Sequence, residues 1–278
     1  MHKYLVISFF IISLLFVFFL FKSKLVTTTM QYFPIDEEAM FEDAKTEISV
    51  VDQGPKIEWT THSVSSEDSY LRQDVSLLYE NGKFKGVQNK WEQNQRQLSL
   101  TQPFEQRHSS LLQSISFHHG EIHRTNDQIN SIQQMTSAQL YFIHDNQTIY
   151  FFDFPSNSFE KKWAKKLDEI TDQQLQFHWN NLINHLNIEE ENYDSIPLTA
   201  LVQYEQKALP GRTMDETKKI IGQLWEGLYK NYIILLGEKE IQQSTHYMPL
   251  IMFHKNNDHL LVIFELNGEK QKLIQKIS

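Results

Sequence analysis

The sequence predicts an α+β fold in which one N-terminal transmembrane helix precedes an antiparallel β-meander, central helices and a C-terminal β-meander. Three observations lead to this prediction. The chain opens with an uncharged apolar run at residues 4–21, and side chains over residues 47–154 alternate between apolar and polar with a period of two. From residue 155 the apolar period becomes helical, and strand-like alternation returns near the C-terminus.

The first predicted element is the membrane helix, whose sequence YLVISFFIISLLFVFFLF contains no charged side chain. About 20 apolar residues cross the hydrocarbon core of a bilayer, where the backbone must bond to itself in a helix. The run is longer than the apolar part of a cleaved signal peptide, and no small-x-small cleavage site follows it at Lys22–Thr27. We therefore expect residues 1–24 to be an uncleaved signal-anchor, with residues 4–21 in the lipid bilayer of the cell membrane.

The orientation of this single-pass anchor is predicted from weaker features. Lys3 precedes the anchor and Lys22 and Lys24 follow it, so the positive-inside rule does not decide between the two orientations. The chain has no cysteine, which suits an oxidising compartment. We expect the rest of the chain to be extracytoplasmic. The anchor, the lack of cysteine and the Gln-, Asn-, Lys- and Ile-rich composition resemble low-GC Gram-positive bacterial envelope proteins in style, without a shared motif.

The charge balance excludes two classes of partner. Residues 1–26 contain three lysines and no acidic residue, so residues 27–278 hold 23 of the 26 basic side chains against all 35 acidic ones, a net charge of −12. A nucleic-acid-binding surface needs a basic face to neutralise phosphates, and a domain lying on anionic lipid needs the same. We therefore expect no nucleic-acid partner.

Residues 25–46 are predicted to form a stalk or short helix. Pro34 precedes five acidic residues between Asp36 and Asp43, an arrangement typical of the first turn of a helix, here over residues 35–46. Beyond the stalk we expect a β-rich region at 47–154 and a region of helices and terminal strands at 155–278. The two regions form either one large domain or two small ones.

The β-rich region is divided by turn residues. Asn81-Gly82 is the strongest hairpin signal in the chain, and Gly54-Pro55, His119-Gly120 and Asp145–Gln147 mark further turns. The predicted strands are Glu47–Val51, Lys56–His62, Asp74–Tyr79, Lys83–Gln88, Gln97–Thr101, Leu111–Phe117, Glu121–Arg124, Leu140–His144 and Thr148–Phe154.

Three helices are predicted from apolar stripes and capping boxes. Phe159–Ile170 carries the first stripe, a capping box at Thr171–Gln174 opens a second helix, and another at Thr213–Glu216 opens the longest one. Residues 189–191 are predicted to be loop. The terminal strands are predicted at Tyr247–Phe253, His259–Leu266 and Lys270–Ile277, with turns at Asn256–Asp258 and Asn267-Gly268.

One cluster has the chemistry of a metal site. His118, His119, Glu121 and His123 supply imidazole and carboxylate groups, which are good ligands for zinc and other transition metals. A hairpin turning at His119-Gly120 would bring these side chains near one another. A solvated, histidine-rich turn is the competing interpretation, since this spacing is not a defined metal motif.

No catalytic or cofactor motif is present. The chain has no cysteine, no G-x-S-x-G or S-x-x-K sequence and no nucleotide-binding glycine motif. We therefore expect no cofactor and favour a membrane-anchored, extracytoplasmic, non-enzymatic protein that contacts another membrane or envelope protein in a regulatory or assembly role. Two alternatives stay open. One is a metal-dependent or other envelope hydrolase that uses the histidine cluster. The other is a small-ligand or glycan-binding module that uses exposed aromatic residues such as some of the five tryptophans.

Overall fold

The computed structural model describes residues 30–277 apart from residues 53, 126, 147 and 238–245. It divides the chain into two compact units, residues 1–30 and 31–278, and all the described strands and helices belong to the second. The predicted membrane helix lies outside the described residues. Within the described part, no helix combines the length and apolar character that a membrane crossing requires.

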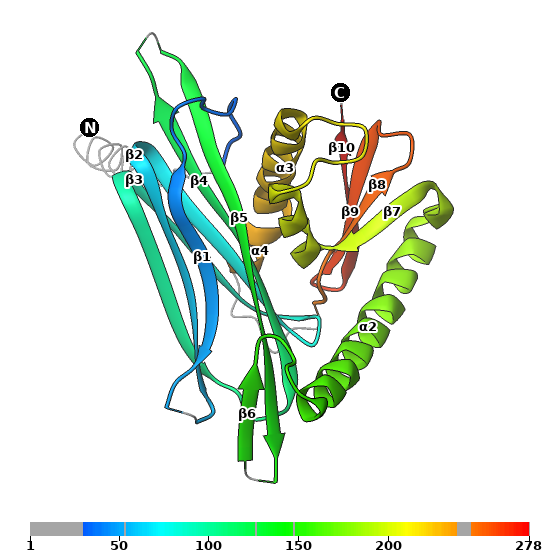
Figure 1. The fold of residues 1–278 in the computed structure, drawn as a ribbon. Coiled ribbons are helices and arrows are strands. Elements are labelled where there is room, and N and C mark those ends of the chain that lie inside the picture. The colour runs from blue at the N-terminus through cyan, green and yellow to red at the C-terminus, as the bar shows by residue number, and fades with distance from the viewer. Residues whose placement is uncertain (1–29, 53, 126, 147, 238–245, 278) are drawn as a thin grey trace, which may run out of the picture. The chain divides into compact units, whose positions relative to one another are not determined.

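The second unit contains two antiparallel sheets (Figure 1). The larger sheet comprises β1 (Phe41–Val50), β2 (Lys56–Glu80), β3 (Lys83–Glu105), β4 (Ser110–His123), β5 (Ile129–Asp145) and β6 (Thr148–Phe152). The smaller sheet has the order β10-β9-β8-β7 and comprises β7 (Tyr193–Pro197), β8 (Leu250–His254), β9 (His259–Leu266) and β10 (Glu269–Lys276). A mixed fold rich in antiparallel strands is thereby confirmed.

A long hairpin of β2 and β3 organises the larger sheet. It turns at Asn81-Gly82, as predicted, and both residues adopt the positive φ that a two-residue hairpin turn requires (49° and 77°). The first half of β2 pairs with β1, whereas its second half pairs with β4 on the same edge. The sheet therefore folds back on itself, and β1 crosses over β4 and β5 (Figure 1).

The space between the two halves of this folded sheet is filled by apolar side chains. Trp59 of β2 is almost fully buried there, and its indole Nε1 donates a hydrogen bond of 2.9 Å to Ser114 Oγ of β4. The surrounding core residues are Ile48, Ile57, Leu78, Leu112, Leu140 and Phe142. Their burial closes the sheet over a continuous apolar core.

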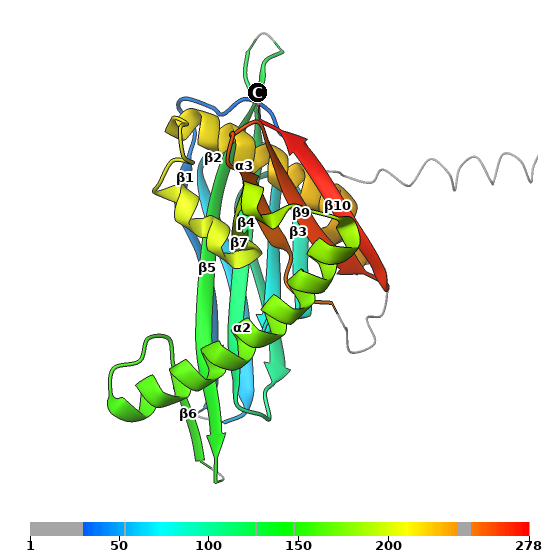
Figure 2. The same cartoon turned by 90° about the vertical axis from the view of Figure 1, so that its right-hand side faces the viewer.

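Helices cover one side of the larger sheet and contact the smaller one. They are α2 (Ser158–Leu186), the 3₁₀ helices η1 (Glu190–Asn192) and η2 (Leu198–Glu205), α3 (Met214–Leu228), the π turn η3 (Tyr229–Ile233) and α4 (Ile234–Gly237). Figure 2 shows α2 crossing the face of the large sheet at β4 and β5. Trp225 of α3 stacks on Phe117 of β4 with ring centroids 5.0 Å apart, which joins α3 to the same sheet.

The predicted helix over residues 35–46 is wrong, because β1 begins at Phe41 and residues 36–40 form an irregular turn. Asp36 Oδ1 accepts hydrogen bonds from the backbone N–H groups of Glu38 and Ala39, at 3.0 and 2.8 Å. Asp36 also pairs with the guanidinium of Arg124. The acidic group that favoured a helix start therefore supports a turn instead.

The predicted turn at His119-Gly120 is also wrong, because β4 runs without a break from Ser110 to His123. A Cβ atom on Gly120 would lie 2.8 Å from Ser69 Oγ and 2.9 Å from an Ile132 side-chain carbon. Glycine is needed at this position for close packing inside the sheet, and the chain reverses several residues later.

The predicted boundary at Thr171 does not exist, since α2 is one continuous helix of 29 residues that passes through it. Thr171 is buried, and the apolar stripe runs from Leu167 to Leu175 on either side of it. The capping box at Thr213 is confirmed. Its Oγ1 accepts from the Glu216 N–H at 3.2 Å, and the Glu216 carboxylate accepts from the Thr213 N–H at 2.8 Å.

Candidate functional site

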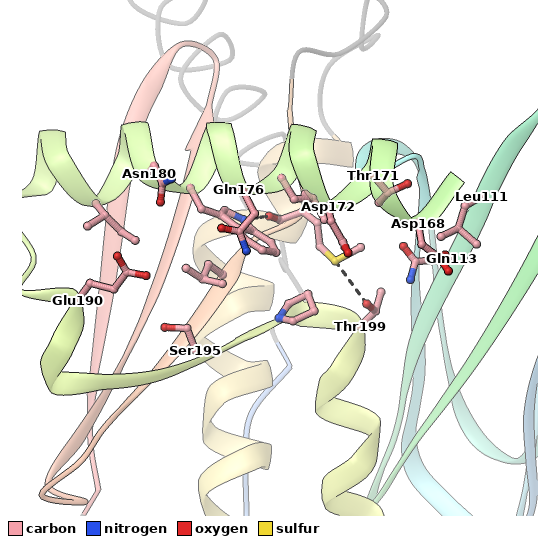
Figure 3. Close-up of a pocket in the computed structure, with 16 residues that line it drawn as sticks. Leu111, Gln113, Asp168, Thr171, Asp172, Gln176, Asn180, Glu190, Ser195 and Thr199 are labelled. Carbon is pink, nitrogen blue, oxygen red and sulfur yellow. Dashed lines mark hydrogen bonds between the residues drawn. The ribbon is translucent and has the colours of Figure 1, made fainter. Parts of the chain in front are cut away.

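A polar cleft separates α2 from the segment that contains β7 and the start of η2 (Figure 3). One end is closed by Leu111 and Gln113 of β4, and the cavity volume is about 460 Å³. This volume lies in the range of small-ligand sites in proteins. The other lining residues are Asp168, Thr171, Asp172, Leu175, Gln176, Trp179, Asn180, Ile183, Glu190, Ser195, Pro197, Thr199, Met248 and Leu250.

The apolar side of α2 fixes the position of the cleft. Trp179 is buried, and its Nε1 donates a hydrogen bond of 2.8 Å to the backbone oxygen of Met248, just before β8. The hydroxyl of Thr199 at the start of η2 contacts the Met248 sulfur at 3.4 Å. Met248 therefore links the helical wall of the cleft to the opposite wall. Figure 3 shows the contact between Thr199 and the sulfur as a dashed line.

The cleft is lined by carboxylates without a compensating cation. Asp168, Asp172 and Glu190 line it, and its lining residues include no lysine, arginine or histidine. Figure 3 shows Asp168 and Asp172 near Gln113, and Glu190 toward the opposite end beneath Asn180. Amide and hydroxyl groups lie between the two acidic ends, so the arrangement favours a cationic ligand that also forms hydrogen bonds.

Asp168 is the most constrained of these acids. Partial burial raises the pKa of its carboxyl group, and the like charge of Asp172 one helical turn away raises it further. The Tyr141 hydroxyl donates a hydrogen bond of 2.8 Å to Asp168 Oδ1 and lowers that pKa in part. A bound cation would remove the repulsion between the two aspartates.

The four predicted metal ligands do not meet at one point, because His118 faces the opposite side of the sheet from the other three and His119 has a partner of its own. The Nδ1 atom of His118 lies 3.1 Å from Asp74 Oδ2, on the buried inner face. His119 faces the other way, with its Nε2 atom 3.2 Å from Ser131 Oγ. Glu121 and His123 form a separate pair at 3.7 Å.

Arg72, Asp74 and His118 form part of a buried polar network inside the folded sheet. All three side chains are fully buried, and an Arg72 Nη atom lies 3.5 Å from Asp74 Oδ1. Arg72 also donates to the backbone oxygen of His119 at 2.9 Å and to the hydroxyl of Ser63. The same Ser63 hydroxyl contacts the Asp74 carboxylate at 2.5 Å.

Hydroxyl groups extend this network across the sheet. The Nε2 atom of His118 lies 2.8 Å from Thr136 Oγ1, which is 2.6 Å from Thr46 Oγ1 of β1. Thr46 also contacts Ser116 at 2.6 Å. Because these groups contact one another instead of a cavity, we interpret the network as structural.

Comparison with known proteins gives no family for the chain. No family model matches it, and no curated protein matches it. Among solved structures, it is similar to a β-glucuronidase from Parabacteroides merdae at 12% identity and a TM-score of 0.24, covering 41% of this chain and 15% of that one.

Two further solved structures show the same low level of similarity. Bacteroides uniformis β-glucuronidase 2 matches at 9% identity and a TM-score of 0.24, covering 70% of this chain and 27% of that one. The sporulation control protein Spo0M from Bacillus subtilis matches at 10% identity and a TM-score of 0.14, covering 84% of this chain and 90% of that one.

Sequence reasoning missed the acids of the cleft. Asp168 and Asp172 are four residues apart, so they share one face of α2. This spacing alone could have indicated a pair of neighbouring carboxylates. Glu190 lies in a segment predicted to be loop, and no local pattern indicates that it faces the helix. The chain reversal between α2 and β7 creates the site.

Proposed function

We propose that this chain is a membrane-anchored, extracytoplasmic binding protein whose cleft between α2 and β7 takes a small ligand bearing amino groups. The single observation that carries the proposal is a cleft lined by three carboxylates and by no basic side chain. The apolar run at residues 4–21 supports anchoring in the membrane. The proposed role of the cleft is ligand binding.

The arrangement of the acids favours a ligand with two amino groups. Asp168 and Asp172 lie at one end of the cleft and Glu190 toward the other, with Gln176 between them (Figure 3). Ammonium groups at both ends of a short chain would each meet a carboxylate. Charge-assisted hydrogen bonds of this kind are about twice as strong as neutral ones.

We expect the purified full chain, in a mild non-ionic detergent, to bind 1,5-diaminopentane and not the neutral isostere 1,5-pentanediol. Removing the negative charge in Asp168→Asn should weaken binding about tenfold, equivalent to ~1.4 kcal/mol for one charge-assisted contact in a half-exposed site. Isothermal titration calorimetry measures both affinities, and raised salt should weaken the diamine complex.

The matched control is Glu191→Gln, because Glu191 neighbours Glu190 in sequence and does not line the cleft. This variant should bind the diamine as the unmodified chain does. Equal binding of diamine and diol, or equal loss in Asp168→Asn and Glu191→Gln, would contradict the proposed amine specificity.

A second candidate function, contact with another envelope protein, is favoured by a group of exposed aromatic residues at β6 and the start of α2. Tyr150 and Phe151 are each 43% exposed and Phe154 is 78% exposed. Tyr150, Phe151 and Phe159 line a groove beside β6. Among the described strands, β6 pairs only with β5, so it is an edge strand. An exposed aromatic patch on an edge strand is typical of protein-binding surfaces.

We expect a photo-crosslinking residue at position 154 to give one reproducible protein adduct in intact membranes. The same residue at position 177 is the control, because Phe177 is 72% exposed and lies outside the aromatic patch. Mass spectrometry of the two crosslinked samples identifies the adducts. Matching adduct patterns at both positions, or no adduct at position 154, would remove this candidate.

A further inference from the structure

The hairpin between β8 and β9 brings together three potential metal ligands from its two ends. His254 is the last residue of β8, His259 is the first residue of β9, and Asp258 directly precedes it. Each can offer one ligand atom, and these atoms all lie within 4.8 Å of one another. Among the described residues, these three are the only group of three or more His, Asp or Glu side chains with that geometry.

The three side chains face a common point. The Nδ1 atoms of His254 and His259 lie 2.8 and 2.6 Å from the same Asp258 oxygen, Oδ1. The two imidazole rings stack with centroids 4.5 Å apart. Ligand atoms on one tetrahedral zinc ion are roughly 3.3 Å apart, given metal–ligand distances of about 2.0–2.2 Å. A small outward shift of Asp258 would therefore make room for an ion.

Two details go beyond the chance proximity of histidine and aspartate. The Nδ1 atom of His254 is buried, and its contact in the described structure is the Asp258 carboxylate at 2.8 Å. The other ring nitrogen of His259, Nε2, lies 2.8 Å from the hydroxyl of Tyr193. A partner on the outer ring nitrogen is what orients most metal-binding histidines.

The backbone around the turn is held in place. Tyr193 of β7 pairs with His254 across the sheet, and Asn257 adopts a φ of 56°, with its N–H bonded to the His254 oxygen at 2.8 Å. Arg212 donates to the backbone oxygen of Asn257 at 2.6 Å. The Lys255 ammonium binds the backbone oxygen of Glu191 at 2.6 Å, so this cation already has a partner.

We propose that His254, Asp258 and His259 bind a divalent transition-metal ion of the zinc class at Nδ1, Oδ1 and Nδ1, with water completing the coordination. Two imidazoles and one carboxylate suit zinc, cobalt(II), nickel and copper(II) better than calcium or magnesium, which prefer oxygen ligands. Asp258 is exposed (63% of its side chain), so the remaining coordination position faces solvent. Tyr193 is the positioning residue that orients His259. This site is independent of the proposed amine-binding cleft.

The test uses the full chain without a histidine tag, treated with EDTA and kept in a mild detergent. Titration with ZnCl2 should give one ion per chain by calorimetry and raise the melting temperature. Titration with CoCl2 should give the visible absorption bands of a low-coordinate cobalt site. No heat and no cobalt spectrum in a folded protein would overturn the proposal.

Variants locate the ion. His254→Gln and His259→Gln should each weaken zinc binding at least tenfold, and Tyr193→Phe about tenfold through the lost outer contact. Asp258→Asn alters only an exposed side chain, so it tests the site even if a histidine variant fails to fold. Retained affinity in Asp258→Asn and in a folded histidine variant would overturn the assignment.

Two control variants separate this site from other histidines. His62→Gln removes a histidine whose Nε2 atom lies 3.7 Å from a lone carboxylate, that of Asp43, and should leave zinc affinity unchanged. His123→Gln tests the β4 histidines that the sequence indicated. Loss of binding in His123→Gln, with full binding in Asp258→Asn, would move the ion to β4 and overturn the proposal.

Discussion

Replacing Arg72 with methionine is expected to destabilise the fold by about 3–5 kcal/mol, because the change leaves the Asp74 carboxylate buried without its cation. Both side chains are fully buried, and Arg72 also satisfies the Ser63 hydroxyl and the backbone oxygen of His119. Burial raises the pKa of Asp74, but its contacts with the His118 imidazole, the charge of Arg72 and a hydrogen bond from Ser63 together hold that pKa below its usual value. Urea denaturation of the full chain in mild detergent measures the loss.

Two controls separate the buried charge from a general effect of arginine removal. Arg107→Met removes an arginine whose side chain is 76% exposed and pairs with Glu105, and should change stability by less than about 1 kcal/mol. The double variant Arg72→Met with Asp74→Asn removes both charges and should recover part of the lost stability. A single Arg72 variant as stable as Arg107→Met would show that the buried pair is not needed.

The second large effect is a loss of stability in acid that depends on His119. Burial and the nearby positive charge of Arg72 together lower the pKa of this imidazole from 6.5 to about 4, against the opposing effect of the Asp74 charge. Between these two pH values the His119 imidazole is mostly protonated in the unfolded chain and mostly neutral in the folded chain. Stability should therefore fall as the pH drops below 6.5, by up to about 1.4 kcal/mol per pH unit, until the pH reaches about 4.

His119→Gln should flatten this part of the pH profile, because glutamine cannot take up the proton in either state. The measurement is the free energy of unfolding in urea at several pH values between 7.5 and 4. His185→Gln is the control, since His185 is exposed on α2 and its loss removes a histidine outside the sheet. The same slope in His119→Gln and the unmodified chain would rule out His119 as the source.

The parts of the fold predicted from sequence are those set by local chemistry. Asn81-Gly82 and Asn267-Gly268 have positive φ and turn their hairpins where expected, because these residues tolerate that backbone conformation. The capping box at Thr213 forms as expected because its hydrogen bonds join residues only three apart.

The misplaced strand boundaries have one physical cause. Ser63, Arg72 and Gln73 are polar residues buried in β2 between the predicted strands Lys56–His62 and Asp74–Tyr79, so a reading that assigns polar residues to solvent interrupts the strand there. Ser63 contacts Arg72 and Asp74 within β2, Arg72 donates to a backbone oxygen of β4, and Gln73 donates to Asn89 of β3. Such pairing depends on contacts distant in sequence, which a local pattern does not contain.

The candidate sites were harder to predict for a related reason. In the cleft, Asp168 and Glu190 come from different segments of the chain. In the hairpin between β8 and β9, His254 and His259 are separated by a turn, and the turn residues alone do not indicate that the two side chains face each other. The sequence did contain one cue for each site, namely the spacing of Asp168 and Asp172 and the histidines at both ends of a tight turn. Residue type alone favoured the denser histidine cluster on β4.

The pairing of β7 with β8 has a consequence for how the chain folds as it is made. β7 ends at Pro197, but its partner β8 begins only at Leu250, after α3 and α4 have been synthesised. The hydrogen bond from Trp179 likewise cannot form until Met248 has been synthesised. Contacts this far apart in sequence form slowly, so we expect the larger sheet to assemble first. A chain emerging from a ribosome or translocation pore would then hold an unfinished second sheet, open to chaperones and proteases, until its last thirty or so residues arrive.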